Sequence, residues 1–188
     1  MKYSRFYPFI LALTVASLAC SIFIGGPDLP AETQPSSPAE ALSMQEQFQQ
    51  ALIQSAATGT ITLEISEGQL TSYLVDKISQ NPNPPFTNPQ ILLRNGQMQM
   101  YGKVTQGWFN ANMLIVMNVG VDETTGQPKI EVASADFGPI PAPQGINAAI
   151  SAIIAEAFTG TLGPVAVGFR LESIAIADGV MSLTGLLK

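Results

Sequence analysis

The fold is decided by one stretch of the chain, Gln90-Ile91-Leu92-Leu93-Arg94-Asn95-Gly96-Gln97-Met98-Gln99-Met100. Apolar side chains recur at every second position on both sides of Asn95-Gly96, which is the period of a β-strand with one buried face. An Asn-Gly pair between two such segments is typical of a tight hairpin, because both residues tolerate a positive φ. The stretch therefore predicts two antiparallel strands joined by a type I′ turn.

The same pattern returns near the C-terminus. Asn95–Gly102 aligns without gaps on Asp178–Gly185, and each segment carries a second glycine six residues after the first. One interpretation is that these are equivalent hairpins, one early and one late, of a sheet that wraps on itself. The other is coincidence, since such turns between alternating strands recur in unrelated β proteins.

Other alternating segments extend this hairpin into a sheet. Strands are predicted at Thr60–Ile65, at Phe109–Val121, at Lys129–Phe137 and, as a hairpin turned at Asp178-Gly179, over Val165–Leu187. A turn over 122–126 joins the second and third of them.

Three segments instead have the apolar period of a helix. The first begins at Ser37-Pro38 and stops near Gly59, the second opens at Ser66 with a capping-box pattern, and the third spans Ile146–Phe158. The order predicts an α+β fold: a curved, mainly antiparallel sheet with an N-terminal helix, a short helix and one apolar helix packed on its concave face.

The N-terminus has the pattern of an export signal. Lys2 and Arg5 precede an apolar stretch from Phe6 to Ile24, and the mostly small residues Ala16-Ser17-Leu18-Ala19 stand directly before Cys20. This resembles a bacterial lipoprotein signal, in which Cys20 would receive a lipid. An uncleaved helical anchor and an ordinary cleaved signal peptide are the alternatives, since the stretch is also close to a membrane-spanning length.

These segments divide the chain into three parts. Residues 1–24 are the signal peptide or anchor, residues 25–39 a Pro/Ser-rich tether, and residues 40–188 a single α+β domain. The expected location is the outer face of the bacterial cytoplasmic membrane, with the positive end of the anchor left inside.

Composition narrows the functional classes. The chain of 188 residues is 46% hydrophobic, only 12% charged and has a net charge of −6, with no run of Lys or Arg that nucleic acid would require. It has no histidine and a single cysteine, which excludes a Ser-His-Asp triad and a cysteine-cluster metal site. The carboxylate pairs Glu64/Glu67 and Asp122/Glu123 flank a helix start and a turn. We therefore expect no enzyme, cofactor or metal.

Four short segments follow one another along the chain, at residues 65–70, 91–96, 136–141 and 176–185. Their order resembles that of the YpmS-like and LmeA-like exported bacterial proteins, whose folds are related to the tubular lipid-binding (TULIP) group. The resemblance implies lipid or membrane association and brings no catalytic residues with it.

Two functions are therefore expected of the domain. In the first, an apolar groove between sheet and helix holds a phospholipid or another apolar ligand, with an adaptable methionine lining. Its candidate residues are Met98, Met100, Trp108, Met113, Ile146, Ile150, Ile153 and Phe158. In the second, the core is filled and the domain is an adaptor that contacts another envelope protein.

Trp108 and Phe109 give a more local expectation. They are adjacent in a predicted strand, so their side chains should point to opposite sides of the sheet. One ring should lie in the core, and the other should lie exposed or at a groove mouth, where an aromatic side chain could rest at a lipid headgroup.

Overall fold

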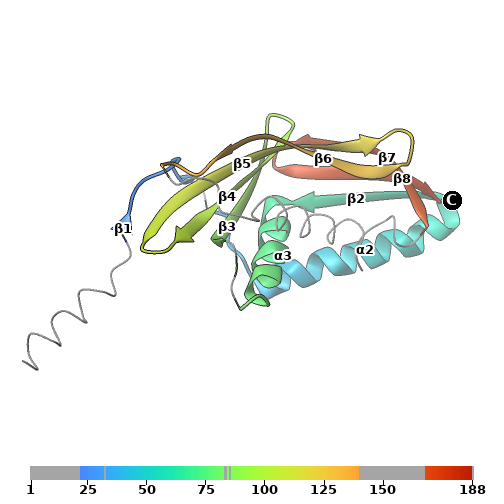
Figure 1. The fold of residues 1–188 in the computed structure, drawn as a ribbon. Helices are drawn as coiled ribbons and strands as arrows, with labels where there is room; N and C mark the ends of the chain where they lie inside the picture. The colour runs from blue at the N-terminus through green and yellow to red at the C-terminus, as the bar shows by residue number, and fades with distance from the viewer. Residues whose placement is uncertain (1–21, 32, 83, 85, 140–167, 188) are drawn as a thin grey trace, which may run out of the picture.

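The computed structural model of the protein describes residues 22–31, 33–82, 84, 86–139 and 168–187. Within them the chain forms two helices and eight strands in curled, mostly antiparallel sheets that make a half-barrel (Figure 1). The predicted α+β class with a curved sheet is confirmed. The apolar helix predicted over Ile146–Phe158 lies outside the described residues. Neither described helix is long and apolar enough to cross a membrane.

Helix α2 (Pro38–Thr58) has the ends that its sequence predicts. The Ser37 hydroxyl accepts a hydrogen bond from the backbone N–H of Glu40, and Pro38 occupies the first turn. Gly59 ends the helix with a left-handed φ of 74°, a conformation that glycine adopts without strain. Met44 and Phe48 of α2 are buried in the core.

Strand β2 (Thr60–Ser66) leads directly into helix α3 (Glu67–Ser79). Exposed and buried side chains alternate along β2, as expected for a strand with one face in the core. Ser66 and Gln69 form the predicted capping box, in which each side chain accepts a hydrogen bond from the other residue's backbone. Both helices lie on the same side of the strands (Figure 1).

The first sheet is built on the central meander of the chain. It contains β3 (Thr87–Arg94), β4 (Gln97–Gln106), β5 (Phe109–Asp122) and β6 (Gln127–Asp136), each antiparallel to its neighbour. The two-residue strand β1 (Ile22–Phe23) pairs in parallel with the beginning of β5.

The second sheet places β8 (Val180–Leu187) between β2 and β7 (Phe169–Ala177). The sheets meet where β7 contacts β3, β5 and β6. The β5–β6 turn fixes this junction, because Leu171 N–H donates to the Gly126 carbonyl and the Arg170 guanidinium donates to the Glu123 carbonyl.

The two similar hairpins have the same turn geometry. Asn95 and Gly96 have φ of 53° and 75°, and Asp178 and Gly179 have φ of 51° and 78°, as a type I′ turn requires. The hairpins lie in different sheets, β3–β4 in the first and β7–β8 in the second. The expectation of one sheet that wraps on itself is therefore replaced by two sheets that meet.

The segment predicted as a tether lies against the domain at several points. The Gln34 backbone N–H donates to the Gln90 side chain, and the Ser37 N–H donates to the Ser72 hydroxyl. Nearer the N-terminus, Pro27 accepts a hydrogen bond from the side chain of Asn112. These contacts satisfy polar backbone groups that a proline-rich segment cannot pair within a helix of its own.

Candidate functional site

The methionines predicted to line a groove are part of the core. Met98 is 5%, Met100 3% and Met113 0% exposed, and they pack with Ile115 and Met117 on one face of the first sheet. Neither of the two pockets described below is lined by any of them. These side chains fill space in the described part of the protein, as flexible methionines commonly do.

The expectation that one of the rings of Trp108 and Phe109 lies in the core was wrong, because both are exposed. Trp108 lies in the turn between β4 and β5 and not in a strand, so the alternation of a strand does not apply to the pair. Both rings are exposed, Trp108 by 54% and Phe109 by 46%. The turn glycine Gly107, with φ of 62°, is the sequence signal that a strand prediction through this point overlooks.

The remaining candidate residues lie outside the described part of the chain. These are Cys20 and the four residues of the apolar helix, Ile146, Ile150, Ile153 and Phe158. The predicted groove between sheet and helix can therefore be compared with the structure only at its sheet residues.

Four exposed apolar side chains gather at one end of the first sheet, and we call this group the apolar tip. It consists of Ile22, Phe23, Trp108 and Phe109, each between 46% and 57% exposed. Backbone pairing brings them together, since Ile22 lies opposite Phe109 and its N–H donates to the Trp108 carbonyl at 2.7 Å. In Figure 1, β1 and the β4–β5 turn form one end of the molecule, and the C-terminus lies at the other.

The segment after β1 is held against β5 by close backbone contact. Ile24 N–H donates to the Asn110 carbonyl at 2.9 Å, and Asn112 N–H donates to the Gly25 carbonyl at 3.0 Å. Gly26 has φ of 118°, and a Cβ there would stand 2.4 Å from the backbone carbonyl oxygen of Asn112. Only glycine fits this conformation and this approach.

Gly26→Ala is expected to detach residues 22–27 from β5 without unfolding the domain. Amide exchange at Asn112, measured by mass spectrometry or NMR, should become about ten- to a hundredfold faster, since its hydrogen-bond partner is lost. Gly25→Ala is the control, because Gly25 shares a positive φ of 103° but a Cβ there meets nothing within 4 Å. Equal exchange in both variants would contradict the role given to the close approach.

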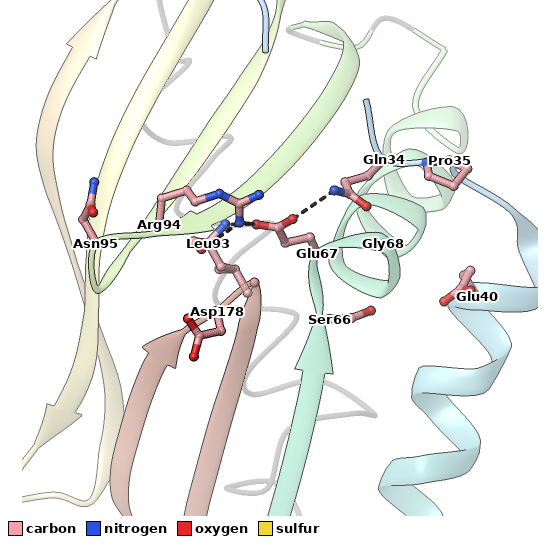
Figure 2. Close-up of a pocket in the computed structure, with 11 residues that line it drawn as sticks. Gln34, Pro35, Glu40, Ser66, Glu67, Gly68, Leu93, Arg94, Asn95 and Asp178 are labelled. Carbon is pink, nitrogen blue, oxygen red and sulfur yellow. Dashed lines mark hydrogen bonds and ion pairs between the residues drawn. The ribbon is translucent and has the colours of Figure 1, made fainter. Parts of the chain in front are cut away.

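A polar pocket of about 670 Å³ lies where the two hairpin turns meet the start of α3 (Figure 2). Its lining residues are Gln34, Pro35, Glu40, Ser66, Glu67, Gly68, Leu93, Arg94, Asn95, Asp178 and Gly179. A smaller pocket of about 300 Å³ lies between α2 and α3 and includes Leu42 and Tyr73.

Glu67 is the central side chain of the polar pocket. Its Oε1 accepts a hydrogen bond from Leu93 N–H at 2.6 Å and pairs with the Arg94 guanidinium, while Oε2 accepts from the Gln34 amide at 2.9 Å. Figure 2 shows the carboxylate between these partners. The Glu67 backbone N–H donates to the Gly179 carbonyl, which ties the second hairpin to the same residue.

Both Glu67 oxygens are committed to structural contacts, so this carboxylate is not arranged as a general base. Glu64, the residue paired with it in the sequence, is exposed on β2. In the other carboxylate pair, the backbone and hydroxyl of Thr125 and the amide of Thr124 lower the pKa of Asp122, which caps the β5–β6 turn. Within the described residues no three acidic or cysteine side chains gather as a metal site would require.

Comparisons of the chain with protein-family models, with curated proteins and with solved structures find no match. The functional argument therefore rests on the sequence and on the placement of the apolar tip and the polar pocket.

Proposed function

We propose that this chain is an exported, non-catalytic domain, held at the outer face of the bacterial cytoplasmic membrane, that acts there as an interaction module of the cell envelope. One observation carries the proposal: β1 begins two residues after Cys20 and is hydrogen-bonded into the first sheet. The apolar stretch that resembles an export signal thus runs directly into the folded body, with no free spacer between them.

The absence of catalysis is part of the proposal and rests on the chemistry of the side chains. The chain has no histidine, and its single cysteine belongs to the export segment. Its most buried carboxylate, among the described residues, is held by three hydrogen-bond donors. Acyl-transfer chemistry needs a nucleophile next to a base, and neither this cysteine nor this carboxylate forms such a pair in the described residues.

Two forms of the module are open to test. The buried methionines Met98, Met100 and Met113 favour an adaptor with a filled core. A lipid groove is the second candidate and is supported by the resemblance to tubular lipid-binding proteins and by the apolar sequence of 146–158. Native mass spectrometry of the protein purified from its membrane distinguishes them: a co-purified phospholipid supports the groove, and a lipid-free mass supports the adaptor.

Cys20→Ala is expected to abolish lipid labelling of the protein. In cells fed a clickable fatty acid, the parent should be labelled and the variant should not, because the Cys20 sulfur is the atom that would receive the lipid. The variant should also move from the membrane to the soluble fraction. A parent that is itself unlabelled and yet firmly associated with the membrane would instead support an uncleaved anchor that ends before β1.

A further inference from the structure

The apolar tip has apolar side chains on both faces of its sheet. Ile22 and Phe109 are register partners and therefore share one face, whereas Phe23, the next residue along β1, points to the other. Trp108 extends the group beyond the strand ends, in the β4–β5 turn. A protein partner would cover one face of such a projection, but a bilayer surrounds it from all sides.

The tip is also free of charge in a protein whose net charge is −6. No Asp, Glu, Lys or Arg occurs between Phe6 and Pro27 or between Val104 and Val121. Charged groups close to the hydrocarbon region would have to be dehydrated, which is costly, and carboxylates would be repelled by anionic lipids. The sequence therefore places no electrostatic barrier where the tip would meet a membrane.

The N-terminal segment that precedes the described residues is joined to this tip. Residues 1–21 contain most of the apolar stretch that resembles an export signal, and they join Ile22 directly. Two residues of extended chain reach about 7 Å, so an anchor at Cys20 would hold Ile22 within that distance. The headgroup layer on each side of a bilayer is of similar thickness, about 5–8 Å.

We propose that the apolar tip inserts into the headgroup–acyl boundary of the membrane that anchors the protein. The partner is a phospholipid bilayer, and Trp108, Phe109, Ile22 and Phe23 are the inserted side chains. Tryptophan is favoured at that depth because its ring is apolar and its N–H is polar. Insertion would fix the orientation of the domain, with the C-terminal end directed away from the membrane. This inference rests on the proposed function.

The sole tryptophan of the chain makes the tip directly observable. The full chain is reconstituted into phosphatidylcholine–phosphatidylglycerol vesicles, with and without brominated acyl chains. We expect brominated lipid to quench the Trp108 fluorescence by at least half, and acrylamide in the water to quench it several-fold less than an exposed tryptophan. The matched control is Trp108→Phe combined with Ile53→Trp, which moves the probe to a position on α2 where the native side chain is 75% exposed.

The outcomes separate this inference from the proposed function. Failure of the parent to float with vesicles would contradict the proposed function and the tip contact together. If the parent floats with vesicles but acrylamide quenches Trp108 as strongly as it quenches the probe in the Ile53→Trp control, the tip contact is overturned. The proposal of a membrane-anchored domain is then unaffected. Protection from acrylamide without quenching by brominated lipid would also overturn it, because a protein would then cover the tip.

Serine substitutions at the tip test the contribution of each ring. Phe23→Ser and Phe109→Ser should each weaken insertion about tenfold. About half of each phenylalanine side chain is exposed, and the substitution removes this apolar area from contact with the membrane. The loss is measured as reduced quenching of Trp108 by brominated lipid. Ile53→Ser on α2 should change nothing. Both phenylalanines are exposed, so folding, checked by circular dichroism, should be preserved. Unchanged quenching in both tip variants would overturn the inference.

Discussion

Glu67→Ala is expected to lower the free energy of unfolding by about 2–3 kcal/mol. The Glu67 side chain is only 7% exposed and accepts hydrogen bonds from the backbone of Leu93, from Arg94 and from Gln34. Removing it leaves the Leu93 N–H, in a residue that is itself 0% exposed, without an acceptor. An unsatisfied buried donor alone costs about 1–3 kcal/mol, and Arg94 loses its charged partner as well.

Urea unfolding followed by circular dichroism measures this loss. Glu64→Ala is the matched control, because Glu64 is exposed on the neighbouring strand and its removal should change stability by less than about 0.5 kcal/mol. Glu67→Gln should be intermediate, since its amide oxygen can still accept from Leu93 but its NH₂ group faces the Gln34 donor. Equal stability of Glu67→Ala and Glu64→Ala would show that the carboxylate does not tie these elements together.

The helix ends and hairpin turns could be predicted from the sequence because each depends on residues only a few positions apart. Ser37, Ser66 and Gly59 mark helix ends through hydrogen bonds and backbone angles that involve only residues three or four positions away. The Asn95-Gly96 and Asp178-Gly179 turns follow from the same kind of short-range preference. Each of these predictions agrees with the structure at the residue concerned.

The division into two sheets was not predictable in this way. β2 follows α2 in the sequence but pairs with β8, more than a hundred residues later, and no local pattern records that choice. The same holds for β1, whose two residues lie in the apolar export segment. An apolar run of this kind indicates insertion into a membrane or a core, and the sequence does not say that its last residues join a sheet edge.

The candidate site was predictable only in part. Period-2 alternation correctly assigns Met98 and Met100 to an inward face, but it cannot tell a groove lining from a filled core. Trp108 was misplaced because it was counted with the strand that begins at Phe109, although it follows the turn glycine Gly107. The contact of Glu67 with Arg94 joins residues 27 positions apart and depends on how the second helix meets the first hairpin. Such a contact leaves no trace in the spacing of either residue.

Gly185→Ala is expected to lower the free energy of unfolding by about 2–3 kcal/mol, which corresponds to about 5–10 °C in Tm. Gly185 lies in β8, the middle strand of the second sheet, opposite Ile61 of β2 and Leu171 of β7. A Cβ there would stand 2.7 Å from the Arg170 carbonyl oxygen and 3.3 Å from Ile61 Cγ2. Because β8 is hydrogen-bonded to β2 on one edge and to β7 on the other, the clash is removed only if the backbone of β7 or β8 moves and the hydrogen bonds between the strands lengthen.

Two other strand glycines turn this into a graded test. Gly102, the counterpart of Gly185 in the first hairpin, would place a Cβ 3.0 Å from the flexible Met113 Cε and 3.2 Å from both the Phe86 ring and the Thr87 carbonyl oxygen. These contacts are tight but looser than the 2.7 Å approach at Gly185, so alanine at Gly102 should cost less stability than alanine at Gly185. Gly120 in β5 has nothing within 4 Å, so alanine there should stabilise by about 0.5 kcal/mol through lower backbone entropy. Thermal unfolding should therefore rank the alanine variants at Gly120, Gly102 and Gly185 in order of falling Tm. A Gly185 variant as stable as the Gly102 variant would mean that β7 can move away from β8, and that the bulge between Leu171 and Ser173 absorbs the added methyl group.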